Sequence, residues 1–235
     1  MKKILFGAFI LPVILLFSGC SDDEPGMSDI QGTWSVYFDT FTETNLEIGE
    51  DGTYTMVLPA LSKVVGNELR YRYEMESGTY TQDGSKVLFT SSDRKQTHTM
   101  EIYAAKGDRM ECFMQVPGTT SDPHPCAARR IRQLSTGDWS GEWLFDDRIF
   151  NMYDTRLTMN PDYTYTGETR IRKSDGYYDD ITISGRIQVC GKYLSIDNPE
   201  LMFYVNEASG DRLSVSIHMK DSFAGDYVVR RDRGK

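Results

Sequence analysis

Gly32-Thr33-Trp34 is a short stretch that the chain contains a second time, with one change, as Gly137-Asp138-Trp139. In each half a strand, a turn and a second strand follow, at residues 46–55 and 157–166. Other landmarks then recur in the same order: Ser77-Gly78 and Ser184-Gly185, Gly107-Asp108-Arg109 and Gly210-Asp211-Arg212, Arg129-Arg130 and Arg230-Arg231. An ordered series of matches indicates an internal duplication. We therefore expect two homologous domains, at residues 29–134 and 135–235.

Strands are indicated throughout both halves by alternation of apolar and polar residues. Leu69, Tyr71 and Tyr73 alternate with arginines, and the stretches 181–189 and 213–220 repeat the pattern. A period of two places one face of a strand in the core and the other in water. Gly- and Asp-containing turns divide each half into about eight short strands. The pattern predicts an all-β chain, with two tandem small antiparallel up-and-down β-barrels of about eight strands each.

The N-terminus predicts export. Lys2 and Lys3 precede an apolar run from residue 4 to residue 17, and small residues then lead to Cys20. The run is shorter than the roughly 18 to 20 residues that span a bilayer as a helix. It resembles the signal peptide of bacterial lipoproteins, which implies a signal at residues 1–19 and lipidation of Cys20. The alternative is an ordinary secreted protein with a cysteine near its cleavage site.

Residues 20–28 predict a tether between the lipid and the first domain. The stretch is acidic and contains Pro25 and Gly26, which favour a solvated, extended chain. It resembles the acidic signal that directs some lipoproteins to the outer face of the outer membrane. We therefore expect a bacterial outer-membrane location, lipid-anchored and exposed at the cell surface. The alternative is a linker that is charged by coincidence.

The composition excludes one class of partner. The formal net charge is −9, and loss of Lys2 and Lys3 with the signal would change it to −11. Phosphate backbones are bound by clustered lysines and arginines. No basic stripe occurs in the sequence, so we expect no nucleic-acid partner.

The duplicated pattern resembles the lipocalin, or calycin, fold. That family begins with a Gly-x-Trp on the first strand, continues as an up-and-down meander and ends with an arginine on the last strand. The resemblance implies an arginine packed on the indole at the closed end of each barrel, a contact that contributes about 0.5 to 2 kcal/mol. The corresponding residues are Gly32, Trp34, Arg129 or Arg130 in the first half, and Gly137, Trp139, Arg230 or Arg231 in the second.

The resemblance leaves the inside of the barrels open. Each half is shorter than a typical lipocalin, and an eight-stranded barrel holds only side chains or one small ligand. The chain carries 14 Tyr and 11 Met, which are bulky enough to fill such an interior. Hollow and filled barrels are both compatible with the sequence.

No arrangement of residues predicts catalysis, a metal site or a cofactor. His98, His124 and His218 lie on separate segments without a second ligand at metal-binding spacing, so they are interpreted as surface or loop residues. Asp146-Asp147 and Asp179-Asp180 follow no calcium-loop pattern. We expect a protein that is not an enzyme.

Three cysteines follow Cys20, an odd number for an oxidising compartment. Cys112 and Cys126 flank the loop of the last hairpin of the first half, where they could form a disulfide. Alternation places Cys112 on a buried face, where a free thiol is equally compatible. Cys190 is expected to be free.

The loop at residues 174–180 is the candidate contact with a ligand or partner. Tyr177, Tyr178 and Asp179 place aromatic rings beside carboxylates, which can stack on a sugar or hold a protein. The alternative is a polar loop whose tyrosines cover the barrel end. Its counterpart at residues 59–67 is apolar and would form a lid or dock on the neighbouring domain.

Two functions therefore compete, and an enzyme is the third interpretation, which acids or histidines with perturbed pKa values clustered in a cleft would support. The first is a membrane-anchored, non-enzymatic, lipocalin-like binding protein for a small apolar or amphipathic ligand. The second is a structural or adhesion-type surface lipoprotein with packed barrels, which binds a glycan or protein partner through its loops. A cavity of about 300 Å³ or more inside a barrel would favour the first function, and a filled barrel the second.

Overall fold

The structure is a computed structural model that describes residues 26–38, 43–65, 68–92, 97–115, 123–145, 148–219 and 222–232. Within these ranges, the side chains of residues 27–28, 59–72 and 222–224 lie outside the description. The predicted signal peptide, Cys20 and most of the predicted tether also lie outside the described residues.

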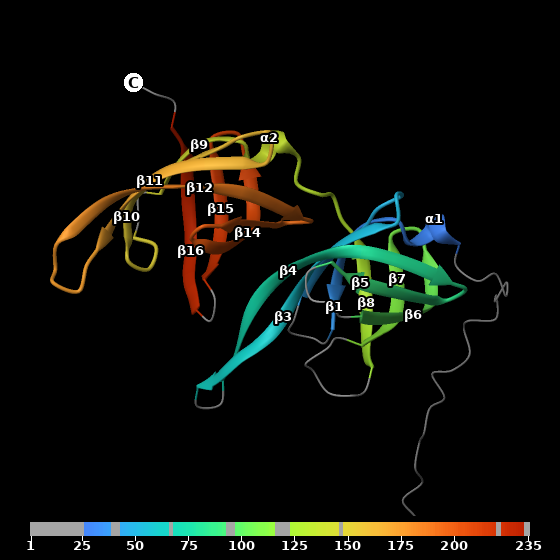
Figure 1. The fold of residues 1–235 in the computed structure, drawn as a ribbon. Coiled ribbons are helices and arrows are strands. Elements are labelled where there is room, and N and C mark those ends of the chain that lie inside the picture. The colour runs from blue at the N-terminus through green and yellow to red at the C-terminus, as the bar shows by residue number, and fades with distance from the viewer. Residues whose placement is uncertain are drawn as a thin grey trace, which may run out of the picture.

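The described chain forms two closed antiparallel barrels of eight strands each, in tandem, as the sequence predicted. Figure 1 shows them side by side, joined by a short connection that enters α2. Consecutive strands pair with one another, and the first strand of each barrel pairs with the last. Closure pairs the backbone N–H and C=O groups of the first and last strands with each other. An open meander would leave these groups exposed.

The elements of the first barrel are α1 (Met27–Ile30), β1 (Gly32–Tyr37), β2 (Glu43–Ile48), β3 (Thr53–Val65), β4 (Glu68–Asp83), β5 (Lys86–Ser91), β6 (Thr97–Lys106), β7 (Arg109–Gln115) and β8 (His124–Arg130). Those of the second are α2 (Thr136–Trp139), β9 (Gly141–Phe145), β10 (Met152–Met159), β11 (Thr164–Arg172), β12 (Tyr178–Cys190), β13 (Tyr193–Asp197), β14 (Glu200–Ser209), β15 (Arg212–Met219) and β16 (Ser222–Arg231).

Burial follows the alternation of the sequence. Along β5 and β7 every second residue is buried, and the residues between them are exposed. The inward residues of each barrel form one hydrophobic cluster, and a third, smaller cluster lies between the barrels. The period of two therefore decides which side chains fill the barrels.

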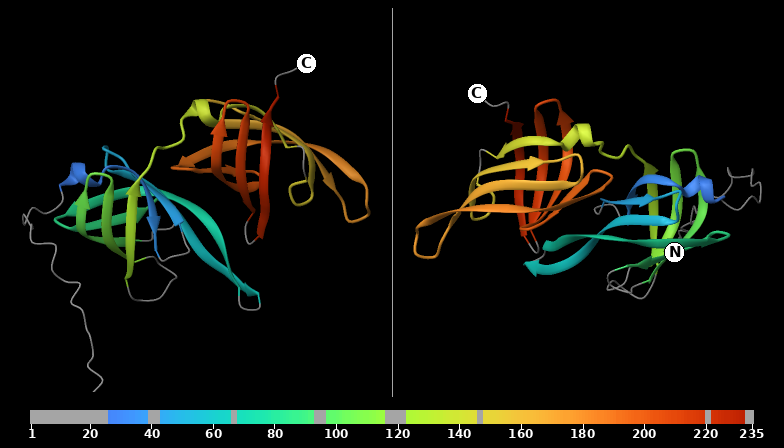
Figure 2. Two further views of the ribbon diagram at one scale, coloured as in Figure 1. Left: turned by 180° about the vertical axis from the view of Figure 1, so that it is seen from behind. Right: turned by 45° about the horizontal axis from the view of Figure 1, so that its top comes forward.

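Two hairpins extend beyond the barrel walls. The β3–β4 pair runs from Thr53 to Thr79, but β4 meets β5 only from Gly78 onward. In the second barrel β11 and β12 pair as far as Arg172 and Tyr178, whereas β12 meets β13 only from Ile187. Both views in Figure 2 show the β3–β4 hairpin reaching toward the second barrel, and the β11–β12 hairpin projecting away from the first.

Candidate functional site

The first barrel is closed at one end by Trp34 and Arg130. The Arg130 guanidinium lies 4.3 Å from the centre of the Trp34 ring, and the indole N–H donates a hydrogen bond of 2.7 Å to the Ile30 carbonyl. Arg130 also donates to the carbonyls of Gln31 and Asp29. Gly32 has a φ of +120°, and a Cβ there would lie 2.4 Å from an Arg130 nitrogen. Glycine is therefore required where the arginine crosses the first strand.

The second barrel has the same arrangement, but it uses different residues from those predicted. Arg231 lies 4.8 Å from the ring of Trp143, and the Trp143 N–H donates to the Trp139 carbonyl at 2.6 Å. Gly141 has a φ of +131°, which corresponds to Gly32. The true counterpart of Gly32-Thr33-Trp34 is therefore Gly141-Glu142-Trp143.

The prediction for Gly137 and Trp139 was wrong by four residues. Both lie in α2, ahead of the first strand, so Trp139 cannot occupy the strand position of Trp34. Trp139 corresponds instead to Ile30, which ends α1. Of the paired arginines, Arg130 and Arg231 cover the indoles, whereas Arg129 and Arg230 are exposed on the outer face.

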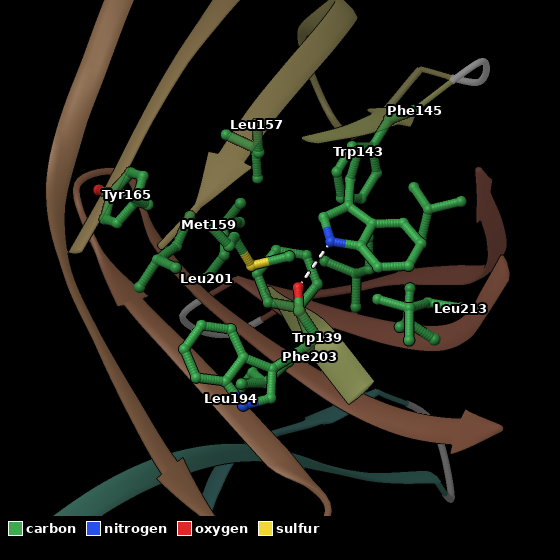
Figure 3. Close-up of a cluster of buried hydrophobic side chains, with 14 of the residues drawn as sticks. Trp139, Trp143, Phe145, Leu157, Met159, Tyr165, Leu194, Leu201, Phe203 and Leu213 are labelled. Carbon is green, nitrogen blue, oxygen red and sulfur yellow. Dashed lines mark hydrogen bonds between the residues drawn. The ribbon is translucent and has the colours of Figure 1, made fainter. Parts of the chain in front are cut away.

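Both barrel interiors are filled by side chains. In the second barrel, Trp143 and Ile217 retain none of their accessible surface, and Tyr165, Leu157 and Leu213 retain 1%. Figure 3 shows Trp143, Leu157, Tyr165 and Leu213 within this cluster of aromatic and aliphatic side chains. A residue that lined a ligand-sized cavity would keep accessible surface facing it. The described interiors therefore favour solid barrels over hollow ones.

A polar group of three side chains is buried in the first barrel. Glu76 accepts a hydrogen bond of 2.6 Å from the Tyr54 hydroxyl and contacts Nε2 of His98 at 2.7 Å. His98 is 1% exposed and Glu76 4% exposed. The interpretation of His98 as a surface residue was therefore wrong. The sequence pattern already indicated this burial, because alternation puts His98 on the same face as Met100 and Ile102.

The two barrels meet through a packed interface. The third hydrophobic cluster comprises Val57, Cys190, Tyr193 and Met202, with Tyr73, Met75 and Tyr204 packed against it. Asn45 of the first barrel is fully buried and accepts a hydrogen bond of 2.7 Å from the Lys192 backbone N–H of the second. A Cβ at Gly191 would lie 2.2 Å from the Asn45 side chain. A glycine there allows the close approach.

A groove of about 530 Å³ lies beside this interface and is formed by both barrels. Its polar wall carries four cationic side chains, two carboxylates, two tyrosines, a serine and an amide: Arg129, Arg130, Arg132, Lys192, Glu43, Glu207, Tyr37, Tyr204, Ser35 and Asn206. Its apolar wall is smaller, with Ile131, Leu134, Val205 and Ala208. Sites for small molecules usually measure about 300–1,000 Å³ and often lie at domain interfaces.

Some of the charged side chains in the groove already have partners within the protein. Arg130 is held on Trp34, and Arg132 forms two hydrogen bonds, of 2.9 and 3.1 Å, with Asp138. Those bonds hold the pKa of Asp138 near 2. Lys192 lies with its ammonium 5.9 Å from the Tyr204 ring. Burial raises the pKa of Tyr204 to about 12, so its hydroxyl keeps its proton and can donate a hydrogen bond.

A second, smaller groove of about 230 Å³ lies on another part of the interface. Tyr73 from the first barrel lines it opposite His218, whose ring lies 4.9 Å away. Burial lowers the pKa of His218, which favours its neutral form. Glu74, Asp197 and Glu200 make this groove acidic.

The predicted contact loop lies at the end of the β11–β12 hairpin. Tyr177 is 75% exposed and Tyr178 48% exposed, so neither covers the barrel end. Tyr178 packs edge-on against Tyr153, at 5.3 Å between ring centres. Asp179 pairs with Lys173 at 2.6 Å, whereas Asp180 pairs with Arg170 at 2.9 Å. The adjacent carboxylates therefore point apart.

Several predicted features cannot be placed. Cys20, Asp146 and Asp147 lie outside the described residues. The apolar counterpart at residues 59–67 follows the backbone of β3 as far as Val65, and the side chains that would make it a lid lie outside the description. Within the described part of the chain, no helix is long and apolar enough to cross a membrane.

No protein-family model and no curated protein sequence matches the chain. Among solved structures it is similar to the haemoglobin receptor HpuA of Kingella denitrificans in its apo crystal form, at 11% sequence identity. The alignment covers 85% of this chain and 90% of that one, with a TM-score of 0.23.

Proposed function

We propose that this protein is a lipid-anchored, non-enzymatic binding protein of the bacterial cell surface, which holds a glycan in the groove between its two solid barrels. One observation carries the proposal: the larger groove lies between two filled barrels and is built by residues of both. The barrels then serve as a rigid support for the groove.

The lining of the groove favours a glycan over an apolar ligand. Hydroxyl groups of a sugar require donors and acceptors, which the lysine, glutamates and asparagine supply. Tyr37 is 42% exposed at the groove, so its ring offers a face on which a sugar can stack. An apolar ligand would desolvate Lys192 and Glu207 and give them no partner in return, which is unfavourable.

The filled barrels also argue against the first of the two functions predicted from sequence. A small apolar ligand inside a barrel would need to displace side chains such as Trp34 or Trp143, both fully buried. Displacing a packed aromatic core costs several kcal/mol, about what large-to-small core substitutions cost.

A non-enzymatic role is supported by the position of the contact between Glu76 and His98. Glu76 and His98 lie inside the first barrel, at most 4% exposed, where a substrate cannot reach them. A general acid or base must come within hydrogen-bonding distance of the reacting group.

The anchor is proposed from the sequence. Lipidation of Cys20 would place two or more acyl chains in the membrane, and each buried CH₂ contributes about 0.8 kcal/mol to anchoring. Residues 20–28 would then hold the first barrel away from the outer leaflet. Incorporation of labelled palmitate that disappears in a Cys20→Ala variant tests this part alone.

Glycan binding is tested with the full-length protein in detergent, on an array of bacterial and host oligosaccharides. We expect at least one glycan to bind, and Tyr37→Ala to weaken its affinity about tenfold or more through loss of stacking. Tyr177→Ala is the matched control, because it removes an exposed tyrosine at the distant β11–β12 tip.

Other outcomes redirect the proposal. Loss of binding in Tyr177→Ala with no change in Tyr37→Ala would move the site to the β11–β12 tip. If no glycan binds and a protein is captured instead, with the capture dependent on Tyr37, the groove is a protein interface and the glycan proposal is wrong.

A further inference from the structure

We propose that Cys112 and Cys126 form a disulfide across β7 and β8 in the exported protein. The two residues are directly opposite each other in the antiparallel pair. Both side chains point into the first barrel, with exposed fractions of 0% and 4%. The inference rests on the proposed function in one respect, namely export to an oxidising compartment.

The backbone geometry suits the bond. Opposite residues of an antiparallel pair have Cα atoms about 4.5 or 5.5 Å apart, and disulfides require about 4.4–6.8 Å. The general Cα separation of such a pair therefore lies within the range that a disulfide spans.

The thiols already interact in the reduced protein. A hydrogen bond to Cys126 and burial together raise the pKa of the Cys112 thiol, and the same hydrogen bond lowers the pKa of Cys126. Cys126 also donates a hydrogen bond of 3.2 Å to the His124 carbonyl.

The remaining described cysteine does not compete for either partner. Cys190 lies in the second barrel with none of its surface exposed, and its S–H points at the carbonyls of Asn45 and Thr55. The pairing of Cys112 with Cys126 is therefore unambiguous among the described thiols.

The reaction needs an oxidant, which we assign to the class of protein thiol oxidoreductases that carry an active disulfide. One of the two cysteines, as its thiolate, attacks that disulfide, forms a mixed disulfide and releases one oxidoreductase sulfur as a thiolate. The thiolate of the other cysteine then attacks the sulfur of the first, which forms the Cys112–Cys126 bond and releases the second oxidoreductase sulfur. The protein loses two electrons and two protons, and the oxidoreductase leaves as a dithiol. Because both sulfurs are buried in the closed barrel, the exchange must precede closure of β8 on β1.

The bond would hold the last strand of the first barrel in place. β8 carries Arg130, which closes the barrel end over Trp34, and β8 is joined to β7 through the loop that the disulfide would close. Cross-linking such a loop restricts the unfolded chain. We expect reduction to lower Tm by about 5 °C or more, an effect absent in a Cys112→Ser/Cys126→Ser variant.

The test uses full-length protein from its own cells, denatured in acid and labelled with a polyethylene-glycol maleimide before and after reduction. With Cys20 lipidated, we expect one label before reduction, on Cys190, and three after it. A Cys190→Ser control should carry none before reduction. Tryptic peptide 110–129 holds both cysteines, so the disulfide makes this peptide lighter by two hydrogen atoms. Three labels on exported protein before reduction would overturn the proposal.

The proposed export and the proposed disulfide can each be wrong while the other is right. A second measurement distinguishes these two cases. Cell fractionation reports the location of the protein. If the protein is cytoplasmic, the purified reduced protein is unfolded and then refolded in glutathione redox buffers, so that both sulfurs are accessible before the barrel closes. Pairing of Cys112 with Cys126 in these buffers supports the disulfide and rejects only the location, whereas free thiols at every oxidising ratio overturn the disulfide itself.

Discussion

At the scale of single residues, each barrel end is held by a tryptophan, an arginine and a glycine that depend on one another. The indole is buried under the guanidinium, the arginine crosses the first strand, and only a glycine with positive φ leaves room for it. A carbonyl at the end of a one-turn helix accepts the indole N–H in both barrels. The helices thus supply a hydrogen-bond acceptor at the barrel end.

This arrangement predicts that Trp143 contributes more to stability than Trp139. Trp143→Phe removes a hydrogen bond, part of a cation–π contact and buried volume, and should lower the free energy of unfolding by about 2–4 kcal/mol. Trp139→Phe should cost less, about 1–2 kcal/mol, because the buried Trp139 N–H has no partner among the described residues. Urea unfolding of the two variants measures the difference. An equal or larger loss in Trp139→Phe would contradict the assignment of Trp143 as the counterpart of Trp34.

At the scale of elements, the two barrels differ in the hydrogen bond made by a buried tyrosine that both contain. In the first barrel, this tyrosine belongs to a polar group that joins three strands. Tyr54 of β3 bonds to Glu76 of β4, which contacts His98 of β6. Tyr165, the counterpart of Tyr54, instead bonds to the turn that follows β13, through the Asn198 carbonyl. The duplicated halves therefore keep the tyrosine and differ in what satisfies its hydroxyl.

A double-mutant cycle tests the polar group. His98→Leu leaves the Glu76 carboxylate buried with Tyr54 as its remaining partner, and should lower the free energy of unfolding by about 3–5 kcal/mol. Adding Glu76→Leu removes the buried charge, so the double variant should be more stable than His98→Leu alone. Chemical denaturation of the three variants gives the coupling energy. Additive losses would show that the contact contributes nothing beyond the packing of each side chain.

At the scale of the whole molecule, the sequence predicted the parts better than their arrangement. Alternation was enough to predict the strands and the barrels, because burial in a β-barrel has a fixed period. The register of the duplication was misjudged since two Gly-x-Trp stretches stand four residues apart at the start of the second half. The longer match, from Asp29 to Trp34 and from Asp138 to Trp143, would have resolved it.

The groove could not be predicted because no local pattern encodes it. Tyr37 and Glu43 come from one barrel, whereas Lys192 and Tyr204 come from the other, and only the docking of two folded units brings them together. Periodicity reports which side of a strand is buried, but it does not say whether the covering surface is the barrel's own core or a neighbour. Tyr73 and Met75 alternate like core residues, yet they pack against the second barrel.

The docking itself is testable through Asn45. Its side-chain oxygen is the partner of the buried Lys192 N–H, so Asn45→Ala leaves that donor unsatisfied and should weaken the interface by about 1–3 kcal/mol. Because an apolar cluster and the Asn45–Lys192 hydrogen bond couple the barrels, we expect the parent protein to unfold in one calorimetric transition and Asn45→Ala to unfold in two, as the barrels uncouple. Asn206→Ala, which changes an exposed asparagine at the groove, should keep the single transition. An Asn45→Ala variant that still unfolds in one step, at an unchanged midpoint, would mean that this contact does not hold the barrels together. The groove between the barrels would then lack the rigid walls on which glycan binding depends.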